Sequence, residues 1–295
     1  MKRIKLNLSK FNNTFIKTVS VLFSLMSALL LLVSKEELGI NTYKEAIVVF
    51  GVVGAVALIF TVVRIFTYKK IEVFNNTKCS LTLRYGDLWE IAFKKKRFGN
   101  DEKKIVVVGV NTAFDTIVDN DLSQIAKPLV SGRTIHGQWL NKMKSKGIDE
   151  ATINQAIQSN LEIQGVNKVS TLDISKKERG NLACFEKGTI AVYEYDNTIF
   201  YLLAIAEFDE NNNAQNSKDE LIESIKALVM YYDRCGQAYD IYIPLLGTGM
   251  SRTDITPEES LKIIASMFEI YKSKLNGNIN IIVYENQRND ISIDV

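Results

Sequence analysis

The chain has 295 residues and a formal net charge of +2, with 46% hydrophobic and 24% charged residues. Residues 1–70 carry 10 Lys or Arg and 3 Asp or Glu, which leaves 26 basic and 31 acidic residues in residues 71–295. A basic first segment thus precedes a mildly acidic remainder, which argues against nonspecific nucleic-acid binding by the larger part. The three cysteines lack metal-ligand spacing and indicate reduced structural thiols.

Two stretches near the start of the chain, residues 18–33 and 46–63, contain no charged side chain. Each approaches the roughly 20 apolar residues that a helix needs to cross a hydrocarbon layer of about 30 Å. The second follows at once without a small-residue cleavage site between them, which argues against a signal peptide. Because neither shows a polar stripe, we expect residues 1–70 to form a two-helix transmembrane hairpin rather than a buried soluble one.

The orientation of this hairpin follows from its basic residues. Five lie before the first stretch and three follow the second: Lys2, Arg3, Lys5, Lys10, Lys17, Arg64, Lys69 and Lys70. The short connection has more acidic than basic side chains. The positive-inside rule therefore predicts a two-pass protein with both termini in the cytoplasm.

Residues 71–295 alternate strand and helix signals. Strands are predicted at residues 71–74, 80–84, 105–110, 189–195, 199–208, 240–246 and 279–284, and helices at 149–161, 217–232 and 257–274. The run 105–110 is continuously apolar and rich in β-branched residues, as in a strand buried on both faces at the centre of a sheet. This order predicts an α/β fold with a mixed sheet covered by helices on both faces, a three-layer α/β/α domain.

A glycine-rich turn follows the strand predicted at 240–246. It reads Gly247, Thr248, Gly249, Met250, Ser251 and Arg252, and a helix begins shortly after it. Such a turn can aim backbone N–H groups at a phosphate, with Arg252 adding positive charge. An ordinary strand-to-helix turn with a solvated arginine is the alternative.

Polar residues also follow two other strands. Asn111, with Thr112 and Ala113, comes directly after the strand 105–110, and its amide offers the donor and acceptor that ribose hydroxyls require. Asp115 beyond it is a possible helix cap. Asp87 follows a strand and a glycine, where it could accept a hydrogen bond from an adenine amino group or cap a helix.

Together these segments resemble a macro domain, the ADP-ribose-binding module. Gly86-Asp87-Leu88 is similar to that family's Gly-Asp-Ile motif, whose Asp contacts adenine. Residues 110–113 resemble its asparagine-bearing loop near the distal ribose, and residues 244–249 its second phosphate loop. The resemblance also implies that Tyr284 lies against the adenine.

The family's Gly-Gly-Gly phosphate loop has no direct counterpart. In its place the chain has Ser131, Gly132, Arg133, Thr134, Ile135, His136 and Gly137. This replacement indicates a pocket adapted to a modified ligand, contacted by His136 unless that histidine is structural. Residues 138–180 have no family counterpart and are predicted to form an inserted helical lid.

With its hairpin, the chain resembles the membrane-spanning macro-domain effectors of type II Thoeris antiphage defence. This resemblance implies a bacterial inner (plasma) membrane protein and a TIR-domain partner that makes an ADP-ribose conjugate, histidine-ADP-ribose. Binding of that nucleotide-derived ligand would drive assembly of a homo-oligomer and damage to the lipid bilayer. On this interpretation the chain is a ligand-binding effector without catalytic residues, metal or cofactor. The alternative is a membrane-anchored ADP-ribosyl hydrolase, for which Asp115 and His136 are the candidate catalytic residues.

Overall fold

The computed structural model describes residues 2–34, 37–40, 42–94, 102–121, 125, 128–174, 177–208, 214–248 and 255–294. Contacts between residues divide the chain into two compact units, Met1–Lys70 with Asn286–Val295, and Ile71–Glu285. The division into domains at residues 1–70 and 71–295 stays a prediction. The compact units group the last ten residues with the helices instead.

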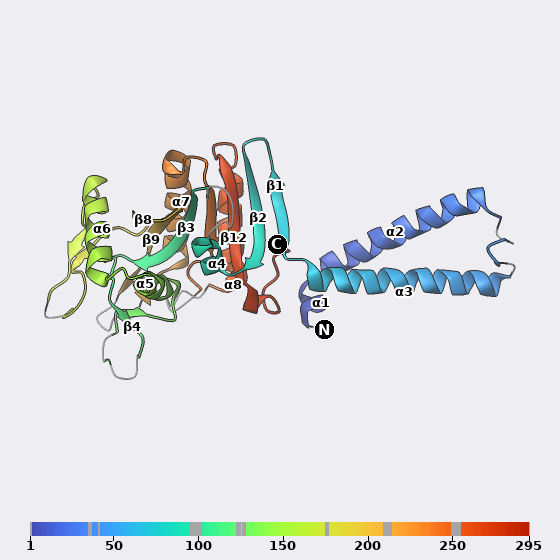
Figure 1. The fold of residues 1–295 in the computed structure, drawn as a ribbon, viewed down its shortest axis with the longest axis horizontal. Coiled ribbons are helices and arrows are strands. Elements are labelled where there is room, and N and C mark those ends of the chain that lie inside the picture. The colour runs from blue at the N-terminus through green and yellow to red at the C-terminus, as the bar shows by residue number, and fades with distance from the viewer. Residues whose placement is uncertain are drawn as a thin grey trace. The chain divides into compact units, whose positions relative to one another are not determined.

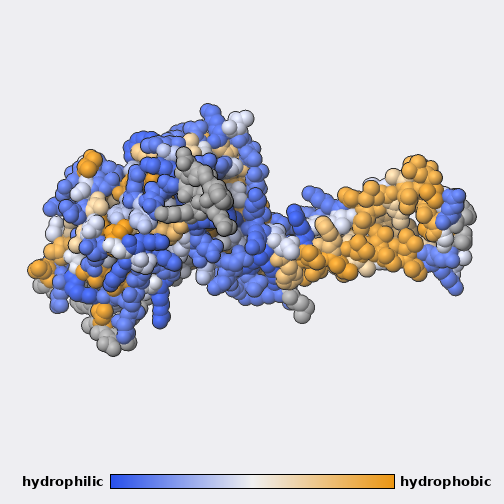
Figure 2. All heavy atoms as spheres, in the orientation of Figure 1, coloured by the Kyte–Doolittle hydropathy of each residue, from blue (hydrophilic) through white to orange (hydrophobic). Residues whose placement is uncertain are grey.

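The first unit is a pair of long helices, α2 (Leu8–Leu32) and α3 (Tyr43–Thr67), preceded by the short α1 (Lys2–Leu6) (Figure 1). Within the described part of the chain, α2 and α3 are the two helices long and apolar enough to cross a membrane. Most of their apolar side chains are exposed, as the orange surface of this unit in Figure 2 shows. An apolar outer surface is the pattern expected of helices surrounded by lipid.

Both helices are longer than the charge-free stretches that predicted them. Helix α2 starts at Leu8, ten residues before the predicted apolar stretch, because a change of polarity does not end a helix. No glycine or proline interrupts the chain between Leu8 and Leu32. Helix α3 begins with a capping box in which the side chains of Thr42 and Glu45 accept each other's backbone N–H.

The hydrophilic base of this unit is a hydrogen-bonded cluster around Tyr68, which we call the basal cluster. The Tyr68 hydroxyl donates to Oδ1 of Asn7, and Oγ of Ser292 donates to the same oxygen over 2.6 Å. The guanidinium of Arg288 donates to the backbone carbonyl of Tyr68, which also accepts from Arg3 at 3.4 Å. The C-terminal residues are thus tied to the ends of the two long helices.

The second unit is built on a mixed sheet, of which eight strands lie within the described residues. Their order is β1 (Lys70–Asn75), β2 (Cys79–Gly86), β12 (Gly277–Tyr284), β11 (Asp240–Pro244), β3 (Lys104–Asn111), β9 (Thr198–Phe208) and β10 (Ala214–Gln215), with β8 (Ile190–Tyr195) also paired to β9. The pairs from β2 across to β9 are parallel, whereas β8 and β10 run antiparallel to β9. Strand β3 is an interior strand, as its apolar sequence predicts.

Helices cover both faces of this sheet (Figure 1). On one face, α4 (Leu88–Phe93), α5 (Ile135–Ser145) and α6 (Glu150–Ile163) share a core with alternate residues of β3, Val106, Val108 and Val110. The other residues of β3 point to the opposite face, where α7 (Lys218–Cys235) contacts β9 and α8 (Pro257–Ile270) contacts β12 and β2. The predicted three-layer α/β/α architecture is confirmed.

Several element ends differ from the predictions for physical reasons. Strand β11 stops at Pro244 rather than residue 246, because proline has no N–H to continue the ladder. Helix α8 stops at Ile270 rather than residue 274, and the residues after it form turns in which the N–H groups of Lys272 and Lys274 donate to carbonyls three residues earlier. The helix predicted at 217–232 is α7, and its N-cap residue Ser217 forms a capping box with Glu220. Residues 209–213 lie outside the described residues, and β10 follows them.

Candidate functional site

The predicted ligand-binding residues follow strands that end at one edge of the sheet. Parallel registry brings together the ends of β2, β12, β11 and β3, at Gly86, Tyr284, Pro244 and Asn111. The carboxyl edge of a parallel sheet is where loops and helix starts form ligand sites in α/β folds. The topology therefore brings Asp87, Tyr284, Gly247 and the Asn111 loop to the same edge.

Asp87 caps helix α4. Its Oδ1 accepts hydrogen bonds from the backbone N–H of Trp89 at 2.7 Å and of Glu90 at 3.3 Å. The cap alternative that the sequence left open is therefore the arrangement seen. The next residue, Leu88, is buried in the core beneath the helix. At the end of β12, Tyr284 is 50% exposed, so a flat ligand can reach its ring.

The loop after β3 is buried and internally bonded. Asn111, Thr112 and Ala113 are each less than 5% exposed. The Asn111 side chain donates to Oδ2 of Asp115 at 2.6 Å and accepts the Asp115 backbone N–H at 3.0 Å. Thr112 is held by backbone hydrogen bonds to Ala206 and Phe185. The amide predicted to contact ribose is thus turned toward Asp115, and its role in ligand contact stays a prediction.

Asp115 has no vacant acceptor position. Besides Asn111, its carboxylate accepts from Nζ of Lys177 at 2.7 and 2.9 Å and from the backbone N–H of Asn181 at 2.7 Å. A carboxylate offers about four lone-pair sites, all occupied here by these donors. Asp115 is therefore poorly suited to take a proton from a water molecule, as a hydrolase base must.

The segment that replaces the Gly-Gly-Gly loop runs from β5 (Val130–Ser131) into α5. A Cβ atom at Gly137 would lie 2.1 Å from the carbonyl oxygen of Ser131, so glycine allows the first turn of the helix to approach this loop. At Gly132 a Cβ would lie 2.1 Å from Oδ1 of Asn120. Arg133 between them is exposed. The glycines of this segment thus serve close packing.

His136 is buried on the first turn of α5, with its ring stacked on Trp139 at a centroid distance of 6.5 Å. Burial lowers the pKa of His136 to about 3, so the ring is neutral at neutral pH. These surroundings correspond to the structural alternative stated for this histidine. Its predicted contact with a ligand stays a prediction.

Only part of the predicted second phosphate loop can be described. Gly247 has a φ of +74°, a left-handed conformation that glycine adopts without strain, and Thr248 follows it. The hydroxyl of Ser260 on α8 donates to the carbonyl of Leu246 over 2.6 Å, which ties the loop to that helix. Gly249, Met250, Ser251 and Arg252 lie outside the described residues.

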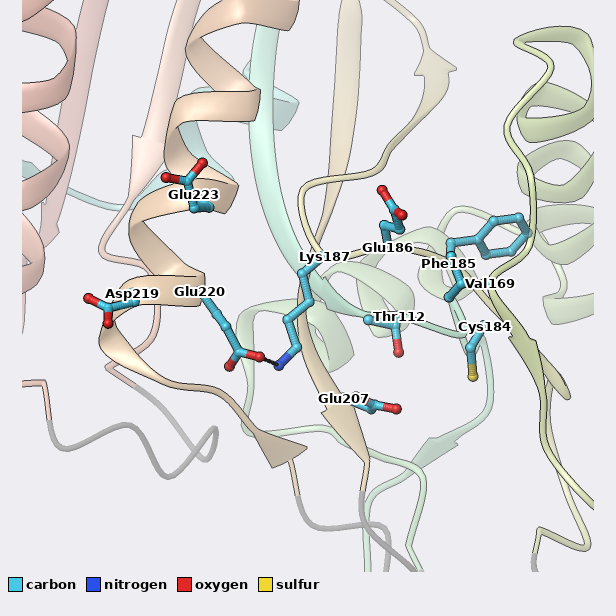
Figure 3. Close-up of a pocket in the computed structure, with 10 residues that line it drawn as sticks. All are labelled: Thr112, Val169, Cys184, Phe185, Glu186, Lys187, Glu207, Asp219, Glu220 and Glu223. Carbon is cyan, nitrogen blue, oxygen red and sulfur yellow. Dashed lines mark ion pairs between the residues drawn. The ribbon is translucent and has the colours of Figure 1, made fainter.

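A pocket of about 440 Å³ lies beside the loop after β3 (Figure 3). Its lining residues are Thr112, Val169, Cys184, Phe185, Glu186, Lys187, Glu207, Asp219, Glu220 and Glu223. Of the predicted site residues that the structure describes, Thr112 alone is among them. Nζ of Lys187 points across the pocket to Glu220 at 2.7 Å, and this hydrogen bond lowers the pKa of Glu220.

Sequence reasoning did not find this pocket, because its walls come from separate elements. Glu220 is recognisable in the sequence only as a helix cap, a role it also has. Burial raises the pKa of the Cys184 thiol, which disfavours the reactive thiolate. Among the described residues, no three His, Cys, Asp or Glu side chains gather in a way that could hold a metal ion.

Comparison with known proteins extends these observations. A family model described as "Thoeris protein ThsA, Macro domain" matches residues 81–284. Thoeris protein ThsA of Bacillus amyloliquefaciens (strain Y2) is 23% identical over 241 residues, covering 78% of this chain and 73% of that protein.

Solved structures give weaker likenesses. A point mutant of the Oceanobacillus iheyensis macrodomain has a TM-score of 0.46 at 10% identity, covering 75% of this chain and 92% of that one. The same macrodomain with ADP has a TM-score of 0.40 at 10% identity, covering 75% and 90%. Since the family match spans more than half of the sequence, this chain belongs to the ThsA macro-domain family of Thoeris proteins.

Proposed function

We propose that this protein is a membrane-anchored effector of Thoeris antiphage defence that senses an ADP-ribose-derived signal. The observation that carries the proposal is the family match over residues 81–284 in a chain that also has two apolar helices before them. A ligand-binding domain of 71–295 and a hairpin of 1–70 in the bacterial inner membrane, with both termini cytoplasmic, are parts of this proposal. The signal would come from a TIR-domain partner, with histidine-ADP-ribose as the expected form.

In the proposed site, adenine lies near Asp87 and Tyr284, and the diphosphate on the loop from Gly247 to Arg252. The distal ribose with its substituent lies near Asn111 and the segment from Ser131 to Gly137. The convergence of strand ends at one sheet edge supports this arrangement. These residue roles come from the resemblance to macro domains.

Signalling requires that the ligand favour one assembly state. A ligand that binds two states equally shifts neither, so occupied chains must associate more readily than empty ones. We propose that occupied chains form a homo-oligomer whose hairpins together disrupt the bilayer. The exposed apolar surface of α2 and α3 supports contact with lipid and with other hairpins.

The experiment combines binding and leakage for the full chain in dye-loaded vesicles. ADP-ribose and histidine-ADP-ribose are titrated by calorimetry, dye release is recorded, and the incubated ligand is examined by chromatography. Gly249→Glu should abolish binding and leakage, because it places a carboxylate where phosphates are expected. Ile270→Glu adds the same charge at an exposed position of α8 and should change neither.

The outcomes separate the alternatives. Absence of binding by the unmodified chain contradicts the proposal. Rapid conversion of the bound ligand supports the hydrolase. The fully hydrogen-bonded carboxylate of Asp115 argues against that outcome. Ligand-dependent leakage without conversion supports the effector.

A further inference from the structure

A short stretch that follows helices α5 and α6 in the chain braces the loop after β3. Residues 177–181, which we call the brace, precede β7 (Ala183–Cys184), and β7 pairs antiparallel with β6 (Ser170–Thr171). Further backbone bonds, Val169 to Cys184 and Leu172 to Leu182, hold this ribbon together. The ribbon positions the brace against a loop more than 60 residues earlier in the chain.

Lys177, the first residue of the brace, is its buried basic residue. Its side chain is 4% exposed, and its Nζ donates to both oxygens of Asp115 and, over 2.6 Å, to the carbonyl of Asn181. These bonds use all three protons of the ammonium group. A buried ion pair contributes little net stability, because the cost of removing both charges from water offsets their attraction. What such a pair does achieve is a fixed geometry, here that of Asp115 and the loop it ends.

The side chain of Asn181 bonds to backbone carbonyls of the same loop. Its Nδ2 donates to the carbonyls of Ala113 at 3.1 Å and Phe114 at 2.9 Å, and to Oδ1 of Asn154 on α6 at 2.8 Å. Phe114 has a φ of +51°, a conformation that is unfavourable for an aromatic residue unless its surroundings impose it. The brace therefore maintains a loop conformation that the loop's own sequence disfavours.

Two more contacts make the brace specific to this position. A Cβ atom at Gly180 would lie 2.2 Å from Oδ1 of Asp115, so the backbone passes as close to the carboxylate as glycine permits. Arg179 forms a two-pronged ion pair with the buried Asp119, over 2.7 and 3.2 Å. The ribbon behind the brace also supplies Val169 and Cys184 to the pocket wall beside Thr112 (Figure 3).

We propose that Lys177 and Asn181 are positioning residues of the ligand site. They hold the loop from Asn111 to Asp115 in the conformation that receives the distal ribose, with its substituent, of an ADP-ribose-like ligand. This inference rests on the proposed function, which assigns the distal ribose to that loop. The adenine and diphosphate are assigned to other strand ends, so the brace should affect only one end of the ligand.

ADP and ADP-ribose separate these two ends, because ADP lacks the distal ribose. Calorimetric titration of the full chain in detergent should show tighter binding of ADP-ribose than of ADP. In Lys177→Met and in Asn181→Ala, affinity for ADP-ribose should fall about tenfold, toward that for ADP, as expected when a hydrogen-bonding site loses its geometry. Affinity for ADP should stay within about twofold, since uniform loss would indicate general destabilisation.

The control variant is Lys103→Met, which breaks an exposed ion pair with Glu194 on the same sheet and should leave both affinities unchanged. Lys177→Met also leaves Asp115 unpaired in the core, so the double variant Lys177→Met with Asp115→Asn removes both charges. This double variant should regain thermal stability and still bind ADP-ribose weakly.

Three results with the variants would overturn the inference. They are unchanged ADP-ribose affinity in Lys177→Met and Asn181→Ala, equal weakening of both ligands, and a double variant that regains full ADP-ribose affinity. Equal binding of ADP and ADP-ribose by the unmodified chain also overturns it while leaving nucleotide sensing intact. If the unmodified chain binds neither ligand, the proposed function itself fails, and this result differs from all the others.

Discussion

The two compact units differ in where their apolar side chains lie: one unit buries them in its interior, and the other exposes them on its surface. In the unit Ile71–Glu285, Phe200 and Ile281 are completely buried between the sheet and its helices. In the hairpin unit, Leu31 and Leu32 are more than 85% exposed, and buried polar side chains such as Asn7 gather at the base. The contrast teaches that the first unit buries its apolar side chains as a fold in water must, whereas the second has the apolar surface expected of helices in hydrocarbon.

The strongest test of this contrast removes one phenyl ring from each unit. Phe200→Ala should lower the free energy of unfolding of the sheet unit by about 3–5 kcal/mol, because it leaves a cavity beside Trp139 and Phe93. Phe60→Ala, at a 54% exposed position of α3, should leave that unfolding unchanged. Tryptophan fluorescence on heating measures it, since Trp89 and Trp139 both lie in the sheet unit. Equal losses in both variants would contradict the contrast.

The second test adds one charge to each unit. Ile59→Arg on α3 should reduce membrane insertion, since an arginine near the middle of a spanning helix costs about 2.5–3.5 kcal/mol. Ile270→Arg on α8 should have no such effect, although the two isoleucines are 64% and 70% exposed. Alkaline extraction of membranes measures insertion. A membrane fraction that is the same for both variants would show that the hairpin is not surrounded by lipid.

The third test concerns pH. The folded pKa of His136 is about 3, below the ordinary 6.5, so the unfolded chain binds a proton that the folded chain excludes. Stability from this group is complete above pH 6.5 and falls as the pH decreases toward 3. Between pH 7 and 5 the loss should be about 2 kcal/mol.

The matched variant for that test is His136→Phe, which keeps a ring against Trp139 but cannot titrate. Its fluorescence melting temperature should fall less between pH 7 and 5 than that of the unmodified chain, by roughly 4–8 °C. Identical pH dependence in both chains would show that the folded chain protonates His136 as readily as the unfolded chain does.

The smallest expected effect lies in the basal cluster. Tyr68→Phe removes the hydroxyl that donates to Asn7, which should cost about 0.5–1.5 kcal/mol. Amide hydrogen exchange of residues 286–294, measured by mass spectrometry, should become about 2- to 10-fold faster. Tyr43→Phe, at a 73% exposed position of the same unit, is the control. Unchanged exchange in Tyr68→Phe would mean that the cluster does not hold the C-terminal residues.

Local signals predicted most of the fold. The apolar run from Ile105 to Val110 identified the interior strand, and the helix predicted at 217–232 is α7, with Ser217 as its N-cap. Charge-free stretches located both long helices, although not their ends, because hydropathy does not register a helix that continues through polar residues. These features depend on residues close together in the chain, so they can be predicted from the sequence.

The site was less accessible to prediction. Sequence places Asp87, Asn111 and Tyr284 at strand ends, and parallel registry brings those ends to one edge. The pairing of Lys177 with Asp115, 62 residues apart, has no local signal, because it depends on where the ribbon of β6 and β7 carries the brace. The acidic pocket at Lys187 likewise requires the tertiary arrangement of five separate segments.

The docking of the C-terminal residues has a practical consequence for work with this protein. A stop codon after Glu285 would spare every residue of the sheet unit, yet it would remove Arg288, Ser292 and the buried Ile291 and Ile293 from the foot of the hairpin. Affinity tags or fluorescent proteins fused to the C-terminal residues would strain their contacts with the basal cluster. The exposed turn around Gly39, between the two long helices, is a more suitable place for a short epitope.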